Sequence, residues 1–323
     1  MVNLRLVVPA DRVATVLDQL VRSRAVVNLI HLPGAARRPD GDVVMCDVAR
    51  EDASVVIADL RELGIHEDGS IAIEYVDTSI SRAADRAERA ATGSPADAVV
   101  WEDVAADTSE SAELSGAFLI FMVLATLIAS VGIYLDSAIL VVGAMVVGPE
   151  FGPVAGVCVA LVQRRPQLAL ASGRALAIGF PLGIAVVVVA SLAFKATGVT
   201  PEVFSDADHG LSAAIANPGF FAFFVAFCAG IAGMLSLTTA KSGALIGVLI
   251  SVTTIPASAN VGVAAAYADW PAFRGSLGQL AINLASLLLA GTLTLLVQRE
   301  LYARRRRVHR REQSDSRENA PVS

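Results

Sequence analysis

Hydrophobic and polar positions divide the chain into two parts with different periods. In residues 1–76, short apolar runs alternate with polar residues, whereas residues 115–298 contain long apolar runs with few charges. Alternation with a period of two predicts strands, and apolar residues every three or four positions predict amphipathic helices. The pattern therefore predicts a soluble N-terminal domain that is joined to a membrane region.

The N-terminal pattern predicts a small α+β domain at residues 1–78. Strands are expected at 3–8, 25–31, 42–48 and 70–76, helices at 10–22 and 52–63, and a Pro- and Gly-rich loop at 33–41. The order βαββαβ is typical of a ferredoxin-like domain. Such domains bind a small-molecule ligand or form homo-oligomers, and others are only soluble modules. No residue here indicates a pocket, so these alternatives stay open.

Residues 79–114 predict a charged helical connector. A polar helix is expected at 80–92, a break follows at 93–95, and a short second helix is expected at 96–105. The connector is either a coupling element that lies along a membrane surface or a spacer.

The region 115–298 predicts six membrane spans. A bilayer core of about 30 Å requires about 20 apolar residues in a helix. The candidate spans are 115–135, 137–162, 167–194, 218–237, 242–266 and 275–297.

Charge supports this division and predicts an orientation. Residues 1–114 hold 11 Arg/Lys and 21 Asp/Glu, whereas residues 115–323 hold 14 and 10. Arg and Lys gather in alternate loops and in the basic, disordered tail predicted at 299–323. The positive-inside rule then predicts cytoplasmic N- and C-termini. The use of 23 Arg against two Lys suggests a bacterial source, hence the cell membrane, with the tail contacting anionic lipid and not nucleic acid.

Two of the six spans are interrupted. The second contains Pro149, Gly152 and Pro153, and the fifth contains a similar polar and proline-bearing segment. The residues of the fifth span that take part are Thr253, Thr254, Pro256 and Asn260. Each interrupted span is the middle member of a set of three, and a repeat of three spans returns inverted in the membrane. Paired interruptions of this kind indicate a transport site between the halves, although kinked packing helices would give the same pattern.

Glu150 is the most informative single residue. A carboxylate within an apolar span is costly and faces a cavity or a partner. Glu150 would bind a cation or carry a proton, unless a re-entrant break lifts it into water. Arg174 in the third span is a candidate charge partner, or its side chain extends to the membrane surface.

Enzyme signatures are missing from the sequence. The residues before Lys195 and Lys241 do not form a P-loop, and there is no HExxH, CxxC or GxSxG motif. The three cysteines are too far apart for a metal-ligand or disulfide pattern. We therefore expect no enzyme activity, no metal and no cofactor.

Residues 125–157, ATLIASVGIYLDSAILVVGAMVVGPEFGPVAGV, resemble the signature of a prokaryotic membrane protein family called domain of unknown function 389, or the uncharacterised hydrophobic domain. The matching positions are Asp136, Ser137, Gly143, Ala144, Met145, Pro149, Gly152 and Pro153. The resemblance extends over about residues 115–298 and implies the topology more than the activity. Family members have apolar residues between these prolines, so a role for Glu150 would be a subgroup property.

Together these features predict a membrane protein that moves a small solute or ion between the second and fifth spans. The N-terminal domain would gate this movement or sense a ligand. The alternative is a membrane sensor or scaffold that transports nothing.

Overall fold

A computed structural model of the chain shows two compact units, each described by itself. The N-terminal unit consists mainly of Met1–Val104, with Gln298–Ser323, and the helical unit consists mainly of Ala105–Leu237 and Lys241–Val297. The structure describes residues 1–76, 81–90, 99–200, 203–204, 209–217, 219–239 and 253–318.

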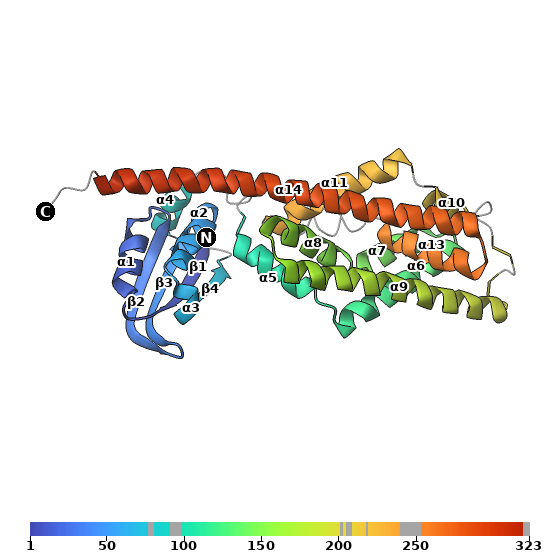
Figure 1. The fold of residues 1–323 in the computed structure, drawn as a ribbon, viewed down its shortest axis with the longest axis horizontal. Coiled ribbons are helices and arrows are strands. Elements are labelled where there is room, and N and C mark those ends of the chain that lie inside the picture. The colour runs from blue at the N-terminus through green and yellow to red at the C-terminus, as the bar shows by residue number, and fades with distance from the viewer. Residues whose placement is uncertain are drawn as a thin grey trace. The chain divides into compact units, whose positions relative to one another are not determined.

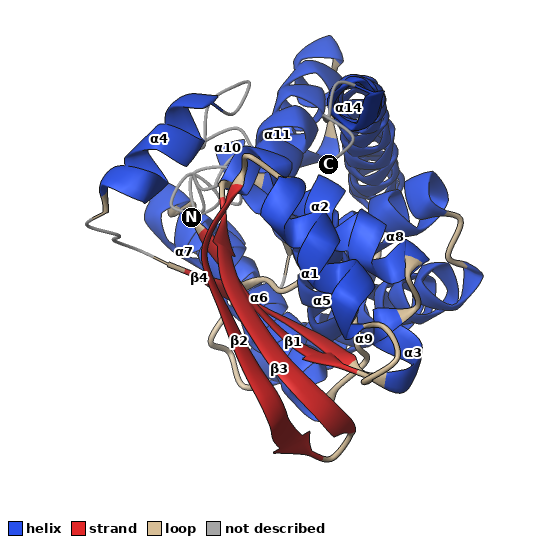
Figure 2. Ribbon diagram, turned by 90° about the vertical axis from the view of Figure 1, so that its left-hand side faces the viewer, coloured by secondary structure: helices blue, strands red, loops and turns tan. Residues whose placement is uncertain are grey.

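The N-terminal unit contains a four-stranded antiparallel sheet (Figures 1 and 2). Its strands are β1 (Val2–Val8), β2 (Val26–Arg37), β3 (Asp40–Val48) and β4 (Ser70–Tyr75), in the spatial order β2-β3-β1-β4. Its helices are α1 (Val13–Arg22), α2 (Arg50–Glu62), the short α3 (Ile65–Asp68) and α4 (Arg82–Ala90). The alternating strands and the two amphipathic helices follow the predicted order, with α3 as an addition.

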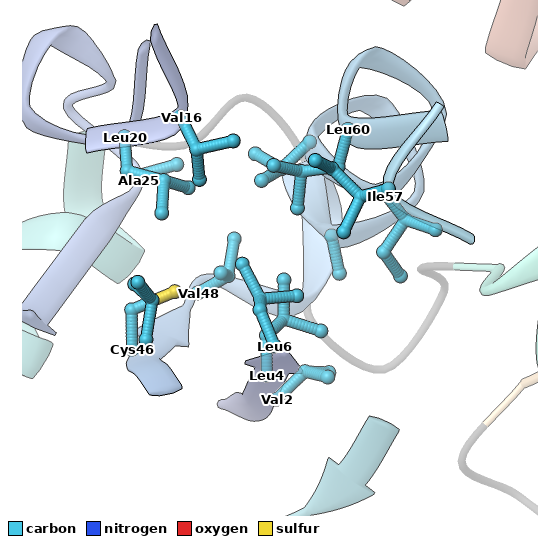
Figure 3. Packing of buried hydrophobic residues seen from close by; sticks show 14 of the residues in the cluster. Val2, Leu4, Leu6, Val16, Leu20, Ala25, Cys46, Val48, Ile57 and Leu60 are labelled. Carbon is cyan, nitrogen blue, oxygen red and sulfur yellow. The ribbon is translucent and has the colours of Figure 1, made fainter. Parts of the chain in front are cut away.

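The core of this unit lies between one face of the sheet and helices α1 and α2 (Figure 3). The even-numbered residues of β1 point inward, and Leu4 and Leu6 are fully buried. Leu20 of α1 and Leu60 of α2 belong to the same cluster. Each such side chain contributes about 1.5–3 kcal/mol through burial.

The loop predicted at 33–41 is much shorter in the structure. β2 continues to Arg37 and pairs with β3, with register irregularities between Val27 and Ile30 and between Leu32 and Ala36. Gly34 has φ +59°, a conformation that favours glycine. The bulges accommodate the Pro33-Gly34 step within a strand, so the turn prediction was wrong there.

The helical unit contains four helices that are long and apolar enough to cross a membrane, among the described residues. They are α6 (Gly116–Tyr134), α9 (Pro166–Ala196), α11 (Phe220–Thr238) and the Trp270–Arg304 part of α14 (Trp270–Glu318). The helices α7 (Ala138–Val147) and α8 (Phe151–Gln163) form a pair bent by 49°, which makes up to five spans if the pair counts as one. The shorter helices are α5 (Trp101–Ser111), α10 (Gly210–Ala216) and α13 (Thr254–Ala266).

The interruption predicted in the second span is therefore present as the break between α7 and α8. The fifth predicted span, 242–266, is described only from residue 253, because residues 240–252 lie outside the described part of the chain. Its second half is α13. The tail predicted to be disordered continues α14 as helix to Glu318.

Helix α13 lies at the centre of the helical unit. Every residue from Thr254 to Ala264 is buried, and α13 packs against α6 and α9. Its sequence, TIPASANVGVAAA, is rich in small residues. Gly262 is in close contact with α9, since a Cβ there would lie 2.7 Å from the Cβ of Val187. Small side chains therefore allow the backbones of α13 and α9 to approach each other closely.

Three pairs of helices in the two halves of the helical unit begin 103 or 104 residues apart, and two of these pairs match in length. Helices α6 and α11 each have 19 residues and begin at 116 and 220, an offset of 104. Helices α8 and α13 each have 13 residues and begin at 151 and 254, an offset of 103. Pro153 and Pro256 are each the third residue of their helix. Helices α9 and α14 begin at 166 and 270, again 104 apart.

Candidate functional site

The candidate site begins at the break between α7 and α8. Gly148 ends α7 in an extended conformation, with φ −62° and ψ 128°. Pro149 follows and lacks a backbone N–H, so it cannot continue the hydrogen-bond pattern of α7. Glu150 then precedes the first residue of α8, and Pro153 lies in the first turn, where its missing donor costs little.

Glu150 is enclosed by the helical unit, with only 5% of its surface exposed. Its Oε1 accepts a hydrogen bond of 2.6 Å from the hydroxyl of Thr254, the first residue of α13. Its Oε2 is buried and has no hydrogen-bond partner among the residues that the structure describes. A Cβ on Gly148 would collide with Oε2 and would lie 2.6 Å from Cγ1 of Ile255. The glycine therefore makes room for the carboxyl group and for the Ile255 side chain.

This contact joins the two helices that correspond in length and offset. Glu150 precedes α8 and Thr254 begins α13, so the N-terminal ends of the two helices meet at the carboxyl group. The Glu150 side chain makes no capping hydrogen bond to the backbone N–H groups of α8, so its printed hydrogen bond is the one from the Thr254 hydroxyl. The sequence predicted both residues, and the structure brings them together.

A second group of side chains surrounds Thr253, which precedes α13. Its hydroxyl oxygen accepts hydrogen bonds from Nε2 of Gln279 at 3.2 Å and from Nδ2 of Asn283 at 2.8 Å. Gln279 also donates to Oδ1 of Asn283 at 3.3 Å, while its own Oε1 is buried without a hydrogen-bond partner. Thr253 and Thr254 thus link the Glu150 carboxyl group to amide side chains of α14.

Asn260 lies two turns further along α13 and connects three helices. Its Oδ1 accepts from the hydroxyl of Ser212 in α10 at 2.8 Å. Its Nδ2 donates to the hydroxyl of Ser276 in α14 at 2.8 Å. All three residues are buried, so each hydrogen bond satisfies a group that water cannot reach. Asn260 therefore has a clear structural role, and the structure does not bring it to Glu150.

The remaining predicted site residues are prolines and a glycine near the starts of α8 and α13, and Arg174 of α9. Pro149 and Gly152 are partly buried, and Pro153 and Pro256 are buried. A Cβ on Gly152 would lie 2.7 Å from the carbonyl oxygen of Ser111, which precedes the first span. Arg174 is exposed on α9, and no ion pair or hydrogen bond joins it to Glu150. The predicted charge partner is therefore not brought to the carboxylate.

Sequence analysis missed the contribution of α14. Four polar residues, Ser276, Gln279, Asn283 and Ser286, follow one another at spacings of three, four and three within an apolar span. This spacing places them on one face of the helix. All four are buried. The same periodicity that predicts amphipathic helices in water could have found this face in the last span.

The described residues contain no group of three or more His, Cys, Asp or Glu side chains that could hold a metal ion. The candidate site is made of one carboxyl group, hydroxyls and amides. Such groups can bind a proton, a small cation coordinated by oxygen, or a polar solute through hydrogen bonds.

The β2–β3 hairpin of the N-terminal unit contains a compact polar cluster. Nε2 of His31 lies 2.6 Å from Oδ2 of Asp42, and the backbone N–H of Gly34 donates to Oδ1 at 2.8 Å. The Gly34 hydrogen bond, with a smaller contribution from His31, lowers the pKa of Asp42. This cluster holds the hairpin and is not associated with a cavity among the described residues.

The fold and the site define a membrane protein with a broken helix and an N-terminal α+β unit. A family model described as "Domain of unknown function (DUF389)" matches residues 145–289, which include the α7–α8 break, α13 and the polar face of α14. The resemblance based on residues 125–157 is confirmed, and the findings support assignment of the chain to this family.

A curated relative is similar to about half of the chain. "Uncharacterized protein MJ0678" of Methanocaldococcus jannaschii is 26% identical over 165 residues, which cover 51% of this chain. The aligned segment spans about half, 49%, of that relative's length. No solved structure matches the chain.

Proposed function

We propose that this protein moves a small solute or ion across a membrane, through a site where α8 and α13 meet at Glu150. The protein would bind and release its ligand without converting it chemically. The residues that would take part are Glu150, Thr253 and Thr254, together with Gln279 and Asn283 of α14.

The observation that carries this proposal is the meeting of two corresponding helix N-termini at a carboxyl group. Helices α8 and α13 have equal lengths and a proline at the same position, and the Glu150–Thr254 hydrogen bond joins them. In transporters built from inverted repeats, broken helices meet near the repeat interface and bind the ligand with their ends. The arrangement in this chain fits that pattern.

The proposal includes six spans arranged as two inverted sets of three. The offsets of 103 and 104 residues between corresponding helices support a repeat of this length. An odd number of spans in each set inverts the second set relative to the first. With six spans, the Arg-rich loops and the tail lie on one side, so we propose cytoplasmic termini and a bacterial cell membrane.

The N-terminal unit would regulate transport from the cytoplasmic side. Its strand order, β2-β3-β1-β4, supports the proposed ferredoxin-like fold. We propose that this unit binds a small ligand or joins copies of the chain into a homo-oligomer.

A second candidate function is that of a membrane sensor or scaffold. The close packing around Glu150 favours it, because Ile255 and Glu150 fill the space beside Gly148. The burial of α13 from Thr254 to Ala264 favours it as well. A transporter must open this region to each side in turn, whereas a scaffold need not open it at all.

Cysteine accessibility distinguishes the two functions without knowledge of the substrate. In a chain without Cys46, Cys158 and Cys228, a single cysteine would replace Thr253, which is partly buried. A membrane-impermeant maleimide would be added to right-side-out and to inside-out vesicles. A transporter should be labelled from both sides, because its site opens alternately.

The matched control is Ala259→Cys, because Ala259 is fully buried in the middle of α13. This cysteine should react from neither side unless the protein unfolds. If the Thr253 cysteine were labelled from one side only or from neither side, transport through this site would be refuted and the scaffold function favoured.

A further inference from the structure

We propose that Glu150 is a proton-binding site and that the protein holds it as a neutral carboxylic acid in the closed arrangement of the structure. The inference deepens the proposed function, on which its role in transport rests, by naming the proton as the coupling ion. Proton binding itself can be measured without transport. The proton would come from water: an O–H bond of a hydronium ion breaks, an O–H bond forms on a lone pair of Oε2, and a neutral water molecule is left.

The first argument is that, among the described residues, the helices next to the carboxyl group carry no cation. No Lys, Arg or other Asp or Glu lies on α6, α7, α8 or α13. A buried carboxylate without a paired cation carries a large desolvation cost, and protonation removes that cost. A neutral acid is therefore the form that this enclosure stabilises.

The other titratable or charged side chains on the surrounding helices do not pair with Glu150. The titratable or charged side chains of these helices include Tyr134 of α6, Cys158 of α8, Arg174 and Lys195 of α9, Asp107 and Glu110 of α5, Glu113 just after α5, and Arg274 with the Arg-rich C-terminal part of α14. Arg174, Arg274, Glu110 and Glu113 are exposed, and Lys195 lies over the ring of Tyr267. No ion pair in the structure involves Glu150.

The second argument is the different surroundings of the two carboxyl oxygens. Oε1 accepts the Thr254 hydroxyl at 2.6 Å, as a carbonyl oxygen would. Oε2 has no hydrogen-bond partner and lies against Gly148, beside the carbon atoms of Ile255. A metal cation such as Na⁺ would require several oxygen ligands around Oε2, whereas a proton requires only the oxygen that carries it. The surroundings therefore favour a proton over a metal cation.

The third argument is the polar route that leads away from the carboxyl group. Thr253 is the chain neighbour of Thr254, and its hydroxyl oxygen accepts hydrogen bonds from Gln279 and Asn283 of α14. On the other side of the break, the Ser111 carbonyl lies against Gly152. When the site opens, these groups offer hydrogen-bond partners for water that delivers or removes the proton. Glu150 is thus placed to exchange its proton in the open arrangement and to hold it in the closed one.

Infrared spectroscopy of the purified full-length protein tests this inference directly. A protonated side chain gives a carboxylic C=O stretching band, which an ionised carboxylate lacks. We expect this band at neutral pH in a choline buffer without Na⁺, with a shift in D₂O. All proteins in this test carry Glu51→Gln, because Glu51 is a second buried carboxyl group. In that background Glu150→Gln should remove the band, whereas Glu113→Gln, which changes an exposed carboxylate, should leave it unchanged.

A second variant keeps the test informative if Glu150→Gln does not fold. Thr254→Val removes the hydrogen bond to Oε1 and should shift the C=O band to higher frequency without removing it. A band that persists in Glu150→Gln, or no band in the Glu51→Gln parent, would overturn the inference. Loss of the parent's band on addition of Na⁺ would also overturn it, because a metal cation would then compete for the site.

Transport measurements separate this inference from the proposed function. Proteoliposomes with an entrapped pH-sensitive dye would report proton movement driven by a pH gradient and a membrane potential. Proton movement in the wild type and its loss in Glu150→Gln would support both the proton-binding site and the proposed transport function. An infrared band without proton movement would leave the proton site in place and refute its role in transport.

Discussion

The two units of this protein differ in where they place polar side chains. In the N-terminal unit the core beside the sheet is apolar, Glu51 and Asp59 are buried on α2, and hydrogen-bonded polar groups such as Asp42 and His31 lie on the hairpin outside the core. In the helical unit, Glu150, Asn260 and Gln279 are buried while large apolar residues such as Ile139 are exposed. Water selects the first arrangement, and a hydrocarbon environment permits the second. The burial of a side chain therefore reflects a different surrounding medium in each unit.

The largest expected effect is in the apolar core of the N-terminal unit. Leu6→Ala should lower the free energy of unfolding by about 2–5 kcal/mol, because a fully buried leucine leaves a cavity. Urea unfolding of a fragment of residues 1–78, which we expect to fold alone, would measure this change.

Val21→Ala is the control in the same unit, since Val21 is 71% exposed and should change stability little. A fragment without a cooperative unfolding transition would show that the N-terminal unit depends on the remainder of the chain.

The next effect concerns close helix contact in the helical unit. Gly262→Ala should destabilise the protein by about 1–3 kcal/mol, because its Cβ would overlap Val187 of α9. Gly143→Ala is the matched control, as no atom lies within 4 Å of the Cβ position. Thermal unfolding in detergent should therefore separate the two variants, and equal melting temperatures would contradict the packing described for α13.

Removal of a buried polar group should have a somewhat smaller effect. Asn260→Leu would remove the hydrogen bonds that Asn260 makes with Ser212 and Ser276, at a cost of about 1–2 kcal/mol. Combining it with Ser212→Ala and Ser276→Ala should recover part of that loss. Additive losses in this mutant cycle, measured by thermal unfolding, would mean that the three side chains do not act together.

The smallest effect is expected at the hairpin. Hydrogen bonds from Gly34 and His31 lower the pKa of Asp42, so the ionised form stabilises the folded state. This stabilisation is present above the ordinary aspartate pKa of 3.8 and is lost as the pH falls through the lowered value in the folded protein. An NMR titration of Asp42 should show the lowered pKa, and Asp42→Asn should remove this part of the acid sensitivity. A titration at the ordinary value would show that the hydrogen bonds do not form in solution.

The sequence predicted most of the order of elements but less of the site. Alternation at Leu4, Leu6 and Val8 predicted β1, and Pro149 predicted the break between α7 and α8. Local rules did not predict that β2 would continue through Gly34, because pairing with β3 overrides the turn preference. The Glu150–Thr254 contact joins residues 104 positions apart, so only the tertiary fold could establish it.

The polar face of α14 shows a different reason for a missed prediction. Mean hydropathy identifies a span but averages out Gln279 and Asn283, although their spacing was available in the sequence. For Arg174, spacing along the chain did not show which way the side chain points from its helix. The structure places this side chain on the exposed side of α9.

Offsets of 103 and 104 residues relate helices of the two halves, but the chemistry at the corresponding helix starts differs. Pro153 and Pro256 occupy the same position of their helices, but Glu150 precedes one helix where Thr253 precedes the other. In a protein that alternates between two states, as proposed, symmetric halves would make the two states equal in energy. With an acid on one side only, the two states would differ in energy, and that difference would set which of them the resting protein occupies.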